Sequence, residues 1–76
     1  MIDGVIKNRI RLLRFEHNEM TQQELAKIVG VTRQTINALE ATKYTPSLDL
    51  AFKIAAAFDE PLEDVFIFIQ KDDEGN

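Results

Sequence analysis

Residues 21–40 read TQQELAKIVGVTRQTINALE, and this stretch contains two helix-start signals on either side of a single glycine. Thr21 and Glu24 have the spacing of a capping box, in which each side chain bonds the backbone amide of the other residue. Apolar residues at helical spacing follow, and Gly30 permits the left-handed conformation that ends a helix. Thr32 can cap a second helix only two residues later. Two short helices joined by a glycine turn predict a helix-turn-helix.

The segments around this stretch also carry helical patterns. N-terminal to it, apolar residues recur at helical spacing between Asn8 and His17, and Asn18 tolerates the conformation in which helices end. C-terminal to it, Ser47 can cap a longer apolar pattern, and Pro61 suits the first turn of a short last helix. In chain order, the predicted helices span residues 8–17, 22–29, 33–41, 48–58 and 62–66.

The apolar residues of these helices predict the core. Ala26 and Ile36 are expected to form the closest contact between the second and third helices, because a small residue at 26 allows a close approach. Leu25, Val29, Val31 and Leu39 are expected to pack around that contact. The buried stripe of the fourth helix is predicted to consist of Leu50, Ala51, Ile54, Ala55 and Phe58.

Four motifs resemble the phage-repressor and Cro-type family, also called the xenobiotic-response-element family. They are TQQELA at 21–26, GVTRQTIN at 30–37, LE at 39–40 and KYTPSL at 43–48. The resemblance extends from Asn8 to about Phe66 and implies a five-helix repressor-like domain that binds specific sequences of double-stranded DNA.

The resemblance has two departures. His17–Glu19 is one residue longer than the usual connection between the first two helices, which is expected to reshape only a loop. Ala41 and Thr42 replace the usual Asn-Gly pair after the third helix, which removes a left-handed cap and a backbone contact with DNA.

From the five predicted helices and the resemblance, the fold class predicted is all-α, with a two-stranded antiparallel sheet formed by the termini as an addition.

The outer face of the third helix carries the side chains expected to read bases. Arg can bond bidentately to guanine and Gln to adenine, and each such pair is worth about 1–3 kcal/mol of discrimination. Arg33 and Gln34, near the N-terminal end, are expected to lie deepest in the major groove, and Asn37 reaches a base edge or a phosphate. Thr35 belongs to the same predicted DNA-binding set. Phosphate contacts are expected from Gln22, Thr32, Lys43 and Tyr44.

Other interpretations of these residues stay open. Arg33, Gln34 and Asn37 could form an ordinary solvated helix face. Tyr44 could pack on the fourth helix instead of contacting a phosphate. His17, the only histidine, is expected to be exposed at a helix end, and it has no partner ligands that would support a metal or catalytic role.

The resemblance further implies an ion pair between Arg14 and Glu40. It would face inward and connect the first helix to the third. Its role is architectural, because losing one partner would leave a partly buried charge without its counter-charge.

Phe66–Ile69 is a continuous apolar run that is too short for its period to decide its structure. It could be a tail that folds back on its own core. We prefer a strand at a dimer interface through Ile67, Phe68 and Ile69, pairing with Ile2–Ile6, because so small a domain has little core to cover these side chains. A two-fold dimer would place two recognition helices about one DNA turn, ~34 Å, apart.

The formal net charge of −4 is distributed unevenly. Residues 1–53 carry a net charge of +2, whereas residues 54–76 carry −6. A mildly basic body beside an acidic end suggests two surfaces with different tasks. Residues 1–70 are expected to form the DNA-binding domain, with 66–70 as its dimerisation segment and 71–76 as an acidic disordered tail.

Composition excludes several classes of protein. The chain has no Cys, which rules out disulfides and thiolate metal sites. No apolar run approaches the roughly 20 residues that a membrane-spanning helix needs, and charged residues interrupt the start of the chain. We therefore expect a cytoplasmic protein without a membrane partner, a metal, a cofactor or a small-molecule ligand.

The sequence thus predicts a transcriptional regulator, a repressor by promoter overlap, that binds a palindromic operator as a homodimer. It predicts no enzyme, because no nucleophile, base and orienting group converge in any motif. Activation stays open, since an acidic surface could contact polymerase. The principal alternative is an antitoxin-like interaction module whose acidic C-terminal region binds a basic protein partner. An enzyme-associated helical domain is a remote third possibility.

Overall fold

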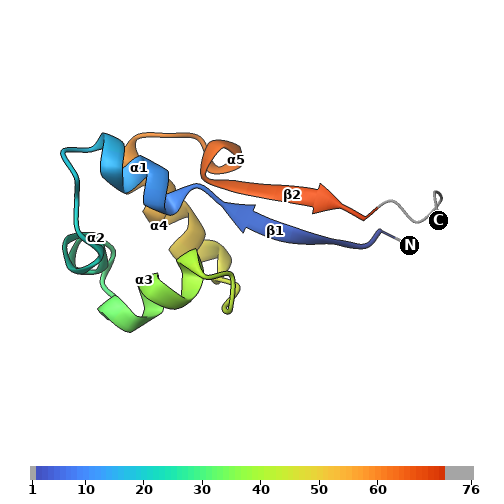
Figure 1. Cartoon of the computed structure of the whole chain (residues 1–76), viewed down its shortest axis with the longest axis horizontal. Helices are drawn as coiled ribbons and strands as arrows, with labels where there is room; N and C mark the ends of the chain where they lie inside the picture. Colours follow the sequence, from blue (N-terminus) through green and yellow to red (C-terminus); the bar gives the residue numbers. More distant parts are fainter. Residues whose placement is uncertain (1, 72–76) are drawn as a thin grey trace.

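The computed structural model describes residues 2–71. One strand precedes the five helices, and one strand follows them. Figure 1 shows the helices as one body from which the paired strands project. This projection makes this part of the chain elongated, with extents of 42 × 21 × 19 Å. The predicted tail 71–76 lies outside the described residues except for Lys71. In chain order the elements are β1 (Gly4–Asn8), α1 (Ile10–Glu16), α2 (Gln22–Val29), α3 (Arg33–Glu40), α4 (Leu48–Phe58), α5 (Leu62–Val65) and β2 (Phe66–Gln70).

The three central helices begin at the residues that the sequence predicts. The Thr21 hydroxyl accepts from the Glu24 amide at 3.0 Å, and the Glu24 carboxylate accepts from the Thr21 amide at 2.8 Å. Thr32 and Ser47 accept from the amide three residues on, at 3.2 and 3.1 Å. Gly30 ends α2 with a φ of 80°, in the left-handed region. The all-α prediction with a terminal sheet is therefore confirmed.

Four predicted helix boundaries differ from the structure. α1 ends at Glu16 and α3 at Glu40, each one residue earlier than predicted, and the other two differences lie where a helix meets a strand. Asn8, the expected first residue of α1, is the last residue of β1. Its side chain accepts from the Ile10 amide at 3.2 Å and donates to the Leu39 carbonyl at 2.8 Å. Phe66, the expected last residue of α5, is the first residue of β2 and pairs with Asn8. Pairing between strands thus takes one or two residues from each helix.

Among residues 2–71, four residues other than glycine have a left-handed backbone. Asn18 does so as expected at the end of α1, with a φ of 58°, and Glu19 follows with 54°. Asp59 ends α4 at 56°. Thr42 has a φ of 58°, in the loop where the usual Asn-Gly pair is absent. A β-branched residue is strained in this conformation, so the loop keeps the left-handed turn without the residue that suits it.

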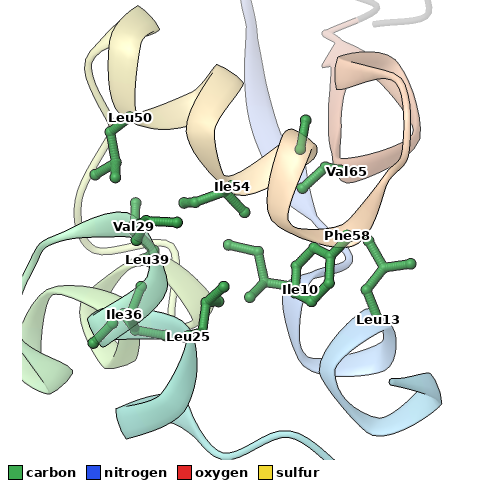
Figure 2. Packing of buried hydrophobic residues seen from close by; sticks show 12 residues of the cluster. Ile10, Leu13, Leu25, Val29, Ile36, Leu39, Leu50, Ile54, Phe58 and Val65 are labelled. Atoms are coloured by element: carbon green, nitrogen blue, oxygen red, sulfur yellow. The ribbon is translucent and has the colours of Figure 1, made fainter. Parts of the chain in front are cut away.

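The core lies between the helices and uses the predicted apolar faces. Figure 2 shows side chains of α2 and α3 packed towards those of α1 and α4. Ala26 and Ile36 are fully buried, as expected for the contact between α2 and α3. The cluster consists of Ile10, Leu13, Leu25, Ala26, Val29, Ile36, Leu39, Leu50, Ile54, Ala55, Phe58 and Val65.

His17 differs from its predicted exposed position, because it is half-buried at the end of α1. Its ring lies 5.2 Å from the Phe58 ring, centroid to centroid, and its Nδ1 is 2.9 Å from the Leu13 carbonyl oxygen. The end of α1 therefore packs over the end of α4, and the aromatic ring covers part of the core.

The two strands form a two-stranded antiparallel sheet whose register runs from Gly4 opposite Gln70 to Asn8 opposite Phe66. We call this pair of strands the terminal hairpin, although the five helices and not a turn connect them. The expected partner of the C-terminal run was Ile2–Ile6, so the paired segment lies two residues further along the chain. Within residues 2–71, no helix has the length and apolar content needed to cross a membrane.

Candidate functional site

The outward face of α3 is polar, and its inward face is apolar. Arg33, Gln34 and Asn37 are exposed, whereas Ile36 and Leu39 are buried against α2 and the core. The structure thus brings the three predicted base-reading side chains to one face of one helix. This helix follows the left-handed turn at the end of α2, as a recognition helix does in a helix-turn-helix.

Thr32 and Thr35 lie at the beginning of α3 and contact each other. Their hydroxyl oxygens are 3.1 Å apart, and the Thr32 hydroxyl also accepts from the Thr35 amide. Thr35 is half-buried and Thr32 exposed. Both hydroxyls are therefore partly used in starting the helix.

Lys43 and Tyr44 lie in the loop between α3 and α4, and both are exposed. The Lys43 amide donates to the Ala38 carbonyl at 2.9 Å, which holds the loop against the end of α3. Tyr44 borders a cavity of about 400 Å³ whose other walls come from β1, from Phe66 and Phe68 of β2, from Leu39 of α3 and from the loop itself. The ring therefore lies beside the terminal hairpin, and no residue of α4 lines that cavity.

A two-pronged ion pair joins α1 to α3. Arg14 Nε donates to Glu40 Oε2 at 2.7 Å, and Nη2 donates to Oε1 at 3.0 Å. The third donor, Nη1, reaches the Met20 carbonyl at 2.8 Å. The side chains of Arg14 and Glu40 are only 15% and 10% exposed, so the pair is largely shielded from water. Charge-assisted bonds in this geometry orient both groups strongly.

Gln22 extends this pair to the surface of α3. Its Nε2 donates to Glu40 Oε1 at 3.1 Å and to Asn37 Oδ1 at 3.3 Å. Sequence reasoning placed the Gln22 side chain at a phosphate, whereas the structure directs both of its N–H groups to other residues of the chain. The four residues Arg14, Glu40, Gln22 and Asn37 form a continuous row of hydrogen bonds, which we call the polar relay. Sequence reasoning missed its Gln22 links.

An open groove of about 1010 Å³ separates α1 from the helix-turn-helix. Arg9 and Arg11 line it on the side of α1, and Gln22 and Asn37 line it on the other side. Both arginines are exposed, and sequence reasoning did not assign them a contact. Their signal in the sequence was the recurrence of Arg at positions 9, 11 and 14. Among residues 2–71, no three His, Cys, Asp or Glu side chains gather in a way that could hold a metal.

Comparison with known proteins gives matches over most of the chain. The helix-turn-helix family model matches residues 10–65, from the start of α1 to the end of α5. An uncharacterized HTH-type transcriptional regulator of Methanocaldococcus jannaschii is 54% identical over 69 residues, which cover 91% of this chain and 100% of the relative. Another, from Bacillus subtilis, is 48% identical over 61 residues, covering 80% and 91%. A crystal structure of a Bacteroides fragilis protein has a TM-score of 0.70 at 26% identity, covering 82% of this chain and 98% of that one.

Proposed function

Because this chain belongs to the Cro- and repressor-type helix-turn-helix family of DNA-binding, non-enzymatic transcriptional regulators, we propose that it represses transcription as a homodimer on a palindromic operator. The observation that carries the proposal is the polar outward face of α3, where Arg33, Gln34 and Asn37 are exposed above a buried apolar face. That face supplies donors and acceptors to base edges when the helix lies in a major groove.

Contacts with the DNA backbone would flank α3 on both sides. On one side, α2 begins at Gln22, and the first amides of a helix attract a phosphate. On the other side, Lys43 and Tyr44 are exposed in the loop after α3. Thr32 would contribute at the beginning of α3 itself. These contacts position the protein on the duplex, and the bases are read by Arg33, Gln34, Thr35 and Asn37.

The terminal hairpin supplies the surface for a second copy of the chain. Val5 and Ile69, paired on one face, are 52% and 49% exposed, and Ile6 and Phe68, paired on the other, are 45% and 51% exposed. A sheet of two strands is marginal in water and leaves two unpaired edges. Apolar side chains on both faces of such a sheet favour burial against another chain. Ile67, Phe68 and Ile69 would lie in that interface.

DNA recognition is tested by selecting bound duplexes from a randomised pool, with the Gln34→Ala variant in parallel. The wild type is expected to enrich a palindrome, and the variant is expected to lose preference mainly at one base pair in each half-site. Enrichment of no sequence at moderate salt would contradict the proposal. A reporter promoter that overlaps the selected site then tests repression, and increased transcription would show activation instead.

Dimerisation is tested separately by sedimentation equilibrium of the Ile69→Lys variant. We expect the wild type to be a dimer and this variant a monomer, because a lysine in the interface would have to be desolvated. Ile28→Lys is the matched control, since Ile28 is 58% exposed on α2, away from the hairpin, and its variant should stay dimeric. A monomeric wild type, or equal dissociation of both variants, would refute this interface.

A further inference from the structure

We propose that the polar relay fixes Asn37 as a hydrogen-bond donor towards DNA, so that this residue selects bases that present acceptors in the major groove. The inference rests on the proposed DNA interface and adds the chemical class of base that α3 reads at one position. It assigns Gln22 a positioning role, in which it acts through Asn37 and not through a phosphate.

The direction of the relay begins at Arg14, which has only donors. Its two hydrogen bonds to Glu40, at 2.7 and 3.0 Å, require both carboxylate oxygens to accept. Because the pair is largely buried and bidentate, its geometry leaves no freedom to reverse these roles. Glu40 therefore presents an acceptor to the next residue of the relay.

Gln22 then has one allowed orientation. Glu40 Oε1 lies 3.1 Å from one end of the Gln22 amide, and a carboxylate oxygen can be faced only by the nitrogen. The same nitrogen has a second hydrogen, which points to the Asn37 amide at 3.3 Å. The group of Asn37 that receives it must be the oxygen. The orientation of both amides thus follows from the ion pair and not from the DNA.

Asn37 consequently directs its oxygen towards Gln22 and its NH₂ group away from it. The residue is exposed on the outward face of α3. Guanine presents two acceptors in the major groove, N7 and O6, whereas adenine and thymine present one each, N7 and O4. Bidentate reading of adenine needs a donor and an acceptor from the same amide, and here the oxygen faces Gln22. We therefore expect Asn37 to prefer guanine, and hence a G·C pair at the position that it reads.

The test repeats the duplex selection with the full chain and two variants. Asn37→Ala locates the base pair that Asn37 reads, as the position where preference disappears. Gln22→Met should lose preference at that same position only, because the freed amide can rotate and accept as well as donate. A preference on the order of tenfold is expected in the wild type. Gln23→Met is the matched control on the same helix, and it should leave the base pattern unchanged.

The Asn37→Asp variant tests the direction of the relay. Aspartate keeps an oxygen for Gln22 to donate to, but it replaces the outward NH₂ with a second acceptor. The preference for guanine should therefore be lost, and the enriched pair at this position should become the reversed C·G pair or an A·T pair, because the amino groups of cytosine and adenine donate. Overall affinity should fall, because the new charge is repelled by the phosphates. Melting curves followed by circular dichroism establish whether each variant is folded. If Gln22→Met does not fold, the base preference of Asn37→Asp tests the inference by itself.

The outcomes separate the inference from the proposed function. A wild type that enriches no sequence overturns the DNA interface and this inference with it. A wild type that enriches an A·T pair at the position of Asn37 overturns the inference alone. So does a Gln22→Met variant that binds every sequence more weakly while keeping the same base pattern, since Gln22 would then have only a structural role.

Discussion

The helical body and the terminal hairpin of this protein differ in how far their apolar side chains are buried. In the body, α1 to α5 direct their apolar faces to one core, and residues such as Ile10, Leu25 and Ile54 have no exposed surface. In the hairpin, apolar side chains on both faces are about half exposed. The helix-turn-helix family model matches residues 10–65, so its limits coincide with those of the body.

This difference teaches that one short chain contains a self-sufficient part and a dependent part. The body has its own core, three helices with side-chain caps, and a largely buried ion pair. Apart from its ladder of hydrogen bonds, the hairpin is tied to the body at its base, where Asn8 bonds the Leu39 carbonyl and Phe66 packs against the core. Changes in the body should therefore alter the free energy of unfolding, whereas changes in the hairpin should alter association between chains.

The largest effect is expected from Arg14→Met, which should lower the free energy of unfolding of the helical body. Glu40 would be left largely buried without a counter-charge, and this type of loss costs about 3–5 kcal/mol. Urea denaturation followed by circular dichroism measures the change. The double variant Arg14→Met, Glu40→Leu should recover most of it, because an apolar pair can replace a buried ion pair. A loss below about 1 kcal/mol in the single variant would place the pair among surface salt bridges.

A smaller effect, confined to the hairpin, is expected from Gly4→Val. A Cβ at Gly4 would lie 2.6 Å from the tip of the Phe68 ring and still closer to the Ile69 carbonyl oxygen. Association should weaken by at least about tenfold, or ~1.4 kcal/mol, in sedimentation equilibrium, while the melting temperature of the helices changes little. The converse control is Gly30→Ala, which meets no atom within 4 Å but has a φ of 80°. It should lower stability without changing association.

Thr42→Gly should stabilise the body, because glycine adopts the left-handed conformation without strain. The expected gain is about 1 kcal/mol, which raises the melting temperature of a domain of this size by roughly 4–8 °C. Thr45→Gly is the matched control in the same loop. Thr45 has no positive φ, so its replacement should only add disorder to the unfolded chain and lower stability. Equal shifts in the two variants would show that strain at Thr42 contributes nothing.

The smallest effect is expected from Lys53→Ala on the outer side of α4. Lys53 Nζ lies 3.1 Å from Asp49 Oδ2, but both side chains are more than half exposed. Such a pair contributes about 0.3–0.5 kcal/mol, and less as salt increases. Thermal melts at low and high salt should therefore converge for the variant and the wild type. A salt-independent loss above about 1 kcal/mol would indicate a role beyond this pair.

The features that could be predicted from the sequence are those decided by neighbouring residues. Thr21, Thr32 and Ser47 each accept from an amide three residues away, so the information for each helix start is local. The outward face of α3 could be predicted for the same reason, since helical periodicity alone separates Asn37 from Ile36 and Leu39.

The features that could not be predicted depend on residues far apart in the chain. Asn8 is removed from the predicted helix by its pairing with Phe66, and His17 is half-buried because its ring packs on Phe58. Gln22 was assigned to a phosphate because its acceptors, on α3, are 15 and 18 residues away. A local pattern can show that such a side chain is polar, but it cannot show which partner the fold brings to it.

The position of the two strands at opposite ends of the described residues has a consequence for synthesis. β1 leaves the ribosome before the five helices described here, and its partner β2 follows only after them. The helices make mostly local contacts and can fold as they emerge, at about 5–20 residues per second. β1 therefore has to wait for its partner strand until the helices between them have been synthesised. Val5 and Ile6 are without their partners Ile69 and Phe68 on the nascent chain throughout that interval.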